Sequence, residues 1–169
     1  MNLNTDWKTN TFITRAYVFI SIGYAYKMYG LLLWNFSKYI VDKYGEETWD
    51  KIAKMANPKY FFFDTHQVYP DNLMNLLSKS ANKITWAKES EIMEEVGIHF
   101  VQLMGEFGYG DLIASMGRQF NEFLKTLNNL HDYLKCSYPE LQSPSFFCDN
   151  EDGYGLHLHY RSKRLVNTF

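Results

Sequence analysis

Residues 118–135 read RQFNEFLKTLNNLHDYLK, and the interpretation of the rest of the chain starts from this stretch. Apolar residues recur in it every three or four positions, which predicts an amphipathic helix with one broad apolar face. They are Phe120, Phe123, Leu124, Leu127, Leu130 and Leu134. His131 falls on the same face. The ordinary explanation of such a position is a buried histidine satisfied by a hydrogen bond, and the alternative is an imidazole bound to iron.

The chain before this helix also has helical patterning, and the chain after it does not. Further helices are expected over residues 29–44, 46–56, 72–83 and 89–106, and Gly108, Gly110 and Gly117 divide the next segment into short pieces. Residues 145–164 instead predict a hairpin of two strands. The fold class is therefore α+β, with N-terminal helices followed by an antiparallel sheet. Because one hairpin is marginal alone, the sheet is expected to be incomplete at the C-terminus.

The second predicted strand carries three polar side chains on one face. Tyr160, Ser162 and Arg164 are spaced by two, so all three leave the same side of the strand. A solvated strand end is the ordinary explanation. The other is a carboxylate clamp, because a guanidinium binds a carboxylate through two hydrogen bonds and each hydroxyl can add one. A haem requires an axial ligand for its iron and polar partners for its two propionates. A histidine on an apolar helix face could supply the first, and such a clamp the second.

Several motifs extend this interpretation over most of the chain. They are MYGLLL (28–33), YGEETW (44–49), HQVYP (66–70), LHDYLK (130–135), YP (138–139), PSF (144–146) and LHYRSKR (158–164). On these motifs the chain resembles the H-NOX (haem nitric oxide and oxygen binding) domain of soluble guanylate cyclases, and is most similar to the atypical, beta-like subunits of invertebrates. The resemblance runs from Met28 to Arg164.

The resemblance implies a set of haem-binding residues, with haem b as the cofactor. His131 falls on the proximal iron ligand, and the propionate-binding motif falls on Tyr160, Ser162 and Arg164. Pro144 corresponds to a proline that packs on the haem. The apolar pocket positions correspond to Leu32, Phe36 and Phe100. One turn before His131, where the family often has an aspartate, this chain has Asn128.

The function that the resemblance implies is sensing of a diatomic gas, which controls cGMP synthesis through domains absent from this chain. A second guanylate cyclase subunit is the expected partner, and the cytoplasm the expected location. The apolar distal positions favour nitric oxide or carbon monoxide, whereas the similarity to atypical subunits favours oxygen. The alternative is a haem-free fragment that binds another cyclase subunit as a regulator.

The domain organisation is predicted from the same resemblance. Residues 1–27 precede the match and are expected to be an N-terminal extension, and residues 28–169 to be a truncated haem-binding domain. Residues 165–169 leave the family pattern, and the chain is expected to lack the cyclase domain of the family. No nucleophile and base pair, phosphate loop or metal cluster indicates a freestanding enzyme. Catalysis is therefore not expected from this chain, although the parent family converts GTP to cGMP.

Composition excludes some other classes of protein. A length of 169 residues with 46% hydrophobic and 21% charged residues suits one globular domain. A net charge of −2 leaves no basic stripe for phosphates, so nucleic acid is not an expected partner. Residues 11–26 include Arg15 and fall short of the ~20 apolar residues of a membrane span.

The remaining metal-ligating residues have simpler explanations. Cys136 and Cys148 lack the spacing of a zinc or redox pair and are expected to be free thiols in a reducing compartment. His157 and His159 share one strand face, but no third ligand is evident nearby. A solvated strand face is the expectation for these two histidines.

Overall fold

The computed structural model describes residues 27–57, 59–117, 120–136, 139, 145–152 and 155–161. The elements, in chain order, are β1 (Lys27–Tyr29), α2 (Gly30–Tyr44), α3 (Glu46–Ala56), β2 (Val68–Pro70), α4 (Asn72–Thr85), α5 (Glu89–Met104), the π-helix η1 (Gly105–Tyr109), α6 (Gly110–Ser115), α7 (Phe120–Leu134), β3 (Ser145–Asp152) and β4 (Gly155–Arg161). The predicted α+β class is confirmed, with helices preceding an antiparallel hairpin. Within this part of the chain, no helix has the length and apolar character to cross a membrane.

Helices α2, α3, α4 and α5 surround a first hydrophobic core. Helix α3 packs on α2 and α4, and α5 contacts both α2 and α4. The largest fully buried side chains of this core are Leu33, Phe36, Ile40, Ile52, Leu73, Leu77 and Ile92. In α2 and α4, which each supply more than one of them, their spacing is the three-to-four residue period that predicted these helices from the sequence.

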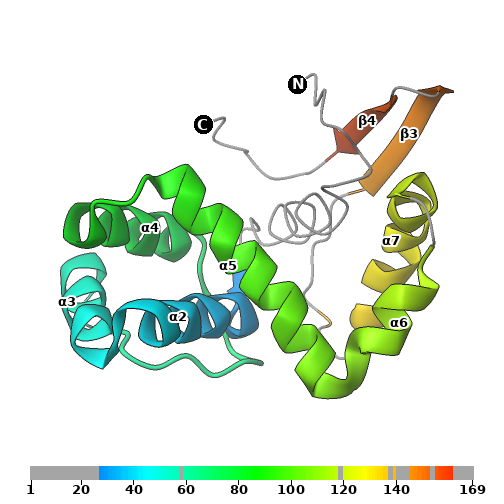
Figure 1. The fold of residues 1–169 in the computed structure, drawn as a ribbon. Helices are drawn as coiled ribbons and strands as arrows, with labels where there is room; N and C mark the ends of the chain where they lie inside the picture. The colour runs from blue at the N-terminus through cyan, green and yellow to red at the C-terminus, as the bar shows by residue number, and fades with distance from the viewer. Residues whose placement is uncertain are drawn as a thin grey trace.

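A second core lies between α5, α7 and the hairpin. Figure 1 shows that α5 extends from the end near α4 to α6, with α7 beyond it and the hairpin above α7. This core contains Phe100, Val101, Leu103, Met104, Met116, Phe123, Leu124, Leu127, Leu130 and Phe146. Helix α5 therefore supplies one end to each core and joins the N-terminal helices to α7.

The hairpin has the expected antiparallel pairing. Phe146 lies opposite Tyr160 and Asp149 opposite His157, and the register is irregular between Asp149 and Asp152. The prediction extended the second strand to residue 164, and β4 is described as far as Arg161. A second small sheet, in which β1 pairs with β2, was not predicted, because strands of three residues are too short to give a period.

The chain makes a close approach at Gly30, where β1 passes into α2. The backbone N–H of Gly30 donates to the carbonyl of Gln67 at 2.8 Å, and that of Leu31 donates to the carbonyl of Thr65 at 3.1 Å. A Cβ at position 30 would lie 1.9 Å from the carbonyl oxygen of Asp64. Only glycine allows the first turn of α2 to lie this close to the loop before β2.

Candidate functional site

Helix α7, which carries His131, buries one apolar face in the second core. Phe123, Leu124 and Leu127 of this helix are fully buried, and Leu130 is 9% exposed. The predicted amphipathic helix is thus confirmed, and His131 lies one residue after the last of these buried leucines. The side chain of His131 lies outside the described part of the structure, so its role as iron ligand stays a prediction.

Asn128 joins α7 to strand β3. Its amide Nδ2 donates to the carbonyl oxygen of Phe146 at 2.8 Å, and its Oδ1 accepts from the backbone N–H of Phe146 at 3.0 Å. Phe146 itself is 5% exposed and belongs to the second core. The helix that carries His131 is therefore fixed to the hairpin by two hydrogen bonds and by apolar packing.

The hairpin register places Tyr160 of β4 directly opposite Phe146 of β3, the residue that Asn128 binds. Residues directly opposite in an antiparallel pair share a face, so position 160 lies on the face of Phe146, toward the second core. Leu158, two residues earlier in β4, packs partly against that core. The side chain of Tyr160 and the whole of Ser162, Arg164 and Pro144 lie outside the described residues. The propionate clamp therefore stays a prediction.

The three predicted pocket residues are interior side chains of α2 and α5. Phe36 is fully buried and Phe100 is 6% exposed. Leu32 is half-buried and packs against both cores. The expected apolar character of these positions agrees with their burial, whereas contact with a haem is not tested by it.

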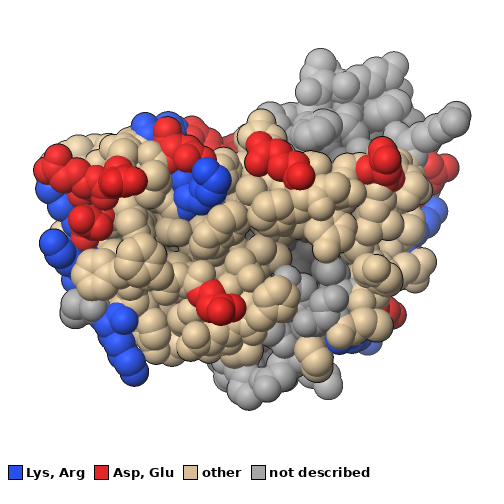
Figure 2. Space-filling model, turned by 90° about the horizontal axis from the view of Figure 1, so that it is seen from below, with Lys and Arg blue, Asp and Glu red and all other residues tan. Residues whose placement is uncertain are grey.

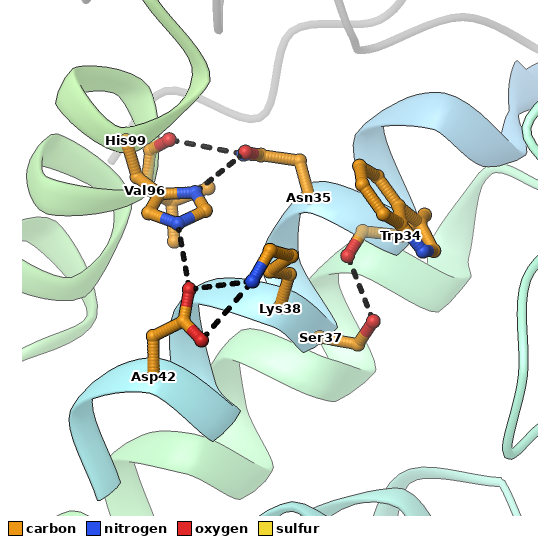
Figure 3. A network of polar contacts seen from close by, with 7 residues as sticks. All are labelled: Trp34, Asn35, Ser37, Lys38, Asp42, Val96 and His99. Carbon is orange, nitrogen blue, oxygen red and sulfur yellow. Dashed lines mark hydrogen bonds and ion pairs between the residues drawn. The ribbon is translucent and has the colours of Figure 1, made fainter. Parts of the chain in front are cut away.

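A polar network links α2 to α5 beside two of these residues (Figure 3). Asn35, 1% exposed, donates from Nδ2 to the carbonyl of Val96 at 3.0 Å, and its Oδ1 lies 2.8 Å from Nδ1 of His99. The other ring nitrogen of His99 lies 3.3 Å from Oδ2 of Asp42. Lys38 completes the network by donating to both carboxylate oxygens of Asp42, at 3.2 and 3.0 Å.

Sequence patterns did not identify this network, although one signal was present. Asn35 interrupts the apolar face of α2 between Leu33 and Phe36, and a buried amide requires hydrogen-bond partners. Its partners could not be named from the sequence, because His99 is 64 residues away along the chain.

A second group of polar contacts lies next to this network. Glu95 of α5 accepts hydrogen bonds from Tyr39 at 2.5 Å and from Lys43, both on α2. Burial, reinforced by the Glu95 carboxylate, raises the pKa of Tyr39 well above its usual range. The hydrogen bonds from Lys43 and then Tyr39 lower the pKa of Glu95. These residues and His99 line a shallow depression of about 300 Å³.

The histidines of β4 pair with an acid on β3. Nε2 of His159 lies 3.0 Å from one carboxylate oxygen of Asp149, and Nδ1 of His157 lies 3.6 Å from the other. Across the described residues, no three side chains of histidine, cysteine or acidic type are arranged to hold a metal ion. Neither Cys136 nor Cys148 takes part in a disulfide bond within the described part of the chain.

The charged surface shows mixed signs. On the face seen in Figure 2, acidic and basic side chains lie beside one another at the α3 and α4 end of the molecule. Much of the surface between that end and α6 is uncharged on this face.

Comparison with known proteins places this fold among haem proteins. The model of the Haem-NO-binding family matches residues 29–169. Soluble guanylate cyclase gcy-31 of Caenorhabditis elegans is 35% identical over 137 residues, and soluble guanylate cyclase 89Db of Drosophila melanogaster is 37% identical over the same length. Each match covers 81% of this chain and 20% of the relative. The chain thus spans about a fifth of the length of these relatives.

Solved structures share the fold at lower identity. The unliganded Fe(II) H-NOX protein from K. algicida aligns with a TM-score of 0.70 and 23% identity, over 81% of this chain and 74% of that one. A further structure, titled "Modulating Heme Redox Potential Through Protein-Induced Porphyrin Distortion", aligns with a TM-score of 0.62 and 21% identity, over 82% of this chain and 76% of that one. At these identities the likeness concerns the fold.

Proposed function

We propose, from the premise that this chain belongs to the Haem-NO-binding family, that residues 28–169 bind haem b through His131 and sense a diatomic gas. The observation that carries the proposal is the clamp between Asn128 and Phe146. It joins the helix of His131 to a strand that pairs directly with the strand of Tyr160. The two halves of the predicted site thus belong to one packed unit.

The residues present fit a flat apolar group with two carboxylates. The binding site of such a group needs apolar side chains around its ring and a few polar side chains positioned to bind its carboxylates. Phe36 and Phe100 are buried apolar side chains on α2 and α5, and Leu32 is half-buried between the two cores. For the carboxylates, the spacing by two of Tyr160, Ser162 and Arg164 in the sequence predicts three polar side chains on one face of a strand.

Each residue has a separate task in this proposal. His131 donates the lone pair of an imidazole nitrogen to the iron, Arg164 and the hydroxyls of Tyr160 and Ser162 bind the propionates, and Pro144 packs on the ring. When bound, the haem would supply the iron to which a diatomic gas binds. Because Asn128 holds both backbone groups of Phe146, a displacement of α7 moves β3 with it.

The gas is nitric oxide, carbon monoxide or oxygen. Leu32, Phe36 and Phe100 have no hydrogen-bond donor in their side chains, and an apolar distal wall favours nitric oxide or carbon monoxide. The similarity to atypical cyclase subunits favours oxygen. Gas titrations of the reduced protein distinguish these outcomes directly.

The relatives are named soluble guanylate cyclases, and this chain corresponds to about a fifth of their length. We therefore propose that the chain regulates cGMP synthesis in the cytoplasm, acting on cyclase domains outside it and together with a second cyclase subunit. A gas at the haem then changes an equilibrium between two states of the assembly, to the extent that its affinity differs between them.

The test is the absorption spectrum of the purified chain expressed with a haem supply, reduced, and exposed separately to the three gases. We expect a ferrous Soret band that shifts with at least one gas. His131→Gly should abolish this five-coordinate spectrum, and added imidazole should restore it, because free imidazole can occupy the position of the lost side chain. A normal spectrum in His131→Gly refutes the assignment. A folded chain that takes up no haem favours the haem-free regulator instead.

A further inference from the structure

The charged residues between positions 72 and 117 are separated by sign along the chain. Helix α4 and the turn that follows it, residues 72–88, contain Lys79, Lys83 and Lys88 and no acidic residue. Residues 89–117, which include α5, η1 and α6, contain acidic residues but no lysine or arginine. The turn directly precedes α5 and η1 directly follows it, so these two points lie about 24 Å apart across the 16 residues of the helix. Figure 1 shows α4 and α6 at opposite ends of α5.

Helix α4 presents a basic face to solvent. Its members are exposed and recur every three or four residues, which places them on one side of the helix and its C-cap. They are Leu76, Lys79, Lys83 and Trp86. Among the described residues, neither of the two lysines takes part in an ion pair. Trp86 is 88% exposed, whereas tryptophan is highly buried on average.

The backbone holds Trp86 in this exposed position. The residue has a φ of 63° at the C-cap of α4, a left-handed conformation that usually belongs to glycine or asparagine. Its N–H donates to the carbonyl of Asn82 at 2.9 Å, and the amide of Asn82 donates to the carbonyl of Ala87 at 2.8 Å. The turn is thus fixed on both sides of the indole. A fixed, exposed tryptophan beside two lysines has the character of an interface anchor.

The other end of α5 presents an acidic face. Large apolar side chains are exposed there beside two carboxylates. The members of this face are Glu106, Phe107, Tyr109, Asp111 and Leu112. Phe107 is 51% exposed, and its ring stacks on that of Trp34 of α2 with centroids 6.0 Å apart, so its position is also fixed.

The carboxylates of the acidic face differ from those at the start of α5. Glu91, in the first turn of α5, pairs with Lys88 at 3.3 Å. Within the part of the chain that the structure describes, Glu106 and Asp111 take part in no ion pair. The chain therefore has unpaired lysines at one end of α5 and unpaired carboxylates at the other, each set beside exposed apolar side chains.

We propose that the basic face of one copy of this chain binds the acidic face of a second copy. The charges of the two faces are complementary, and lysine side chains also bind favourably over aromatic rings. Surface ion pairs alone contribute little, so the indole of Trp86 packing on the exposed rings of the acidic face supplies the apolar part of the contact. Because the faces lie at opposite ends of α5, the contact joins two copies head to tail. The contact is small, and we expect a Kd between about 1 μM and 1 mM.

The first test is sedimentation equilibrium of the full chain from about 10 μM to about 1 mM, and it needs no haem. The average mass should rise above 20.0 kDa with concentration, and less so at high salt, which screens the charges. Lys83→Glu should weaken association about tenfold or more. Arg161→Glu makes the same change of charge at the exposed end of β4 and should associate as the wild type does. A wild-type chain that stays monomeric overturns the proposal, as does equal weakening in both variants.

Trp86→Gly separates the interface from the fold. Glycine adopts a φ of 63° without strain, so the variant should be at least as resistant to urea as the wild type. Loss of the indole should weaken self-association about tenfold or more. A folded Trp86→Gly that associates as strongly as the wild type overturns the proposal.

Mixing of two charge-reversed variants tests which faces meet. Lys79→Glu with Lys83→Glu makes both faces acidic, and Glu106→Lys with Asp111→Lys makes both faces basic. Each variant should be monomeric by itself, and the two should associate when mixed, because opposite charges then face each other again. Self-association of either variant overturns the pairing of the two faces, and so does a mixture that stays monomeric.

Discussion

Asn128 on helix α7 satisfies both backbone groups of Phe146 on strand β3, at 2.8 and 3.0 Å. Phe146 pairs with Tyr160 across the hairpin. The amide of Asn128 bonds to both backbone groups of Phe146, as the backbone of a neighbouring strand would at the edge of a sheet. Unpaired edges are unstable and prone to wrong pairing. The side chain therefore both protects β3 and ties it to the helix of His131.

Replacing this amide should cost stability in proportion to the hydrogen bonds lost. Asn128→Asp keeps an acceptor for the N–H of Phe146 but loses the donor to its carbonyl, so we expect a loss of about 1–3 kcal/mol in the free energy of unfolding. Urea unfolding measures this loss. Asn129→Asp, at an exposed position of the same helix, is the matched control. Equal stabilities of the two variants contradict the clamp.

Gly30 gives a second prediction, for packing of the backbone. In Gly30→Ala the new Cβ would lie 1.9 Å from the carbonyl oxygen of Asp64 and 2.7 Å from Cε2 of Tyr69. Since overpacking typically costs about 1–3 kcal/mol, and a backbone atom is the obstacle here, we expect a loss at the upper end of that range. Thermal unfolding measures it.

Gly105 provides the control for this substitution. It has a helical φ of −61°, and nothing lies within 4 Å of a Cβ at this position. Gly105→Ala should therefore be neutral or stabilising by up to about 1 kcal/mol. A Gly30→Ala variant as stable as Gly105→Ala would show that the approach of α2 to Asp64 is not tight.

The ion pairs between α2 and α5 predict sensitivity to acid. Lys43 and Tyr39 lower the pKa of Glu95 in the folded chain, so the unfolded chain binds more protons near pH 4 and stability rises with pH there. The contribution is complete above the ordinary glutamate pKa of about 4.3 and is lost as the pH falls through the lower folded value. It is small, because Glu95 is 43% exposed.

The comparison is between the wild type and Glu95→Gln from pH 6 to 3. The wild type should lose more stability over this range, because the variant has no carboxylate to protonate. Glu106→Gln, at an exposed position of η1, serves as the control. Parallel pH profiles for the wild type and Glu95→Gln contradict a stabilising role for this carboxylate.

Features that arise from patterns between nearby residues were predicted from the sequence, and contacts between residues far apart along the chain were not. Helix α7 and the hairpin were predicted because their patterns repeat locally, every three to four residues in the helix and every second residue in β4. The pairs Asn128–Phe146 and Asn35–His99 were not, because they join residues 18 and 64 positions apart. Their polar atoms find partners only when the apolar faces have already packed.

The same reasoning explains the β1–β2 sheet. Its register pairs Met28 with Tyr69, and three-residue strands carry no detectable period. The approach of Gly30 to Asp64 is fixed by this pairing. In contrast, the proposed site residues His131, Tyr160, Ser162 and Arg164 came from motifs and their spacing, which is local information, and their roles stay predictions.

The proposed propionate clamp gives the last prediction, for haem retention. In the strand pattern, Arg164 leaves the same face as Tyr160, whereas Arg161 leaves the opposite one. Arg164→Ala removes charge-assisted hydrogen bonds worth about 1.5–3 kcal/mol, which corresponds to a loss of haem affinity of about tenfold or more. Arg164→Lys should fall between wild type and Arg164→Ala, because an ammonium cannot bind a carboxylate through a planar fork. The transfer rate of haem to apomyoglobin measures these differences. Arg161→Ala removes the same charge three residues earlier, at the end of β4, and should leave the rate unchanged. If both alanine variants lose haem equally, net charge on the hairpin rather than a clamp on one face governs retention.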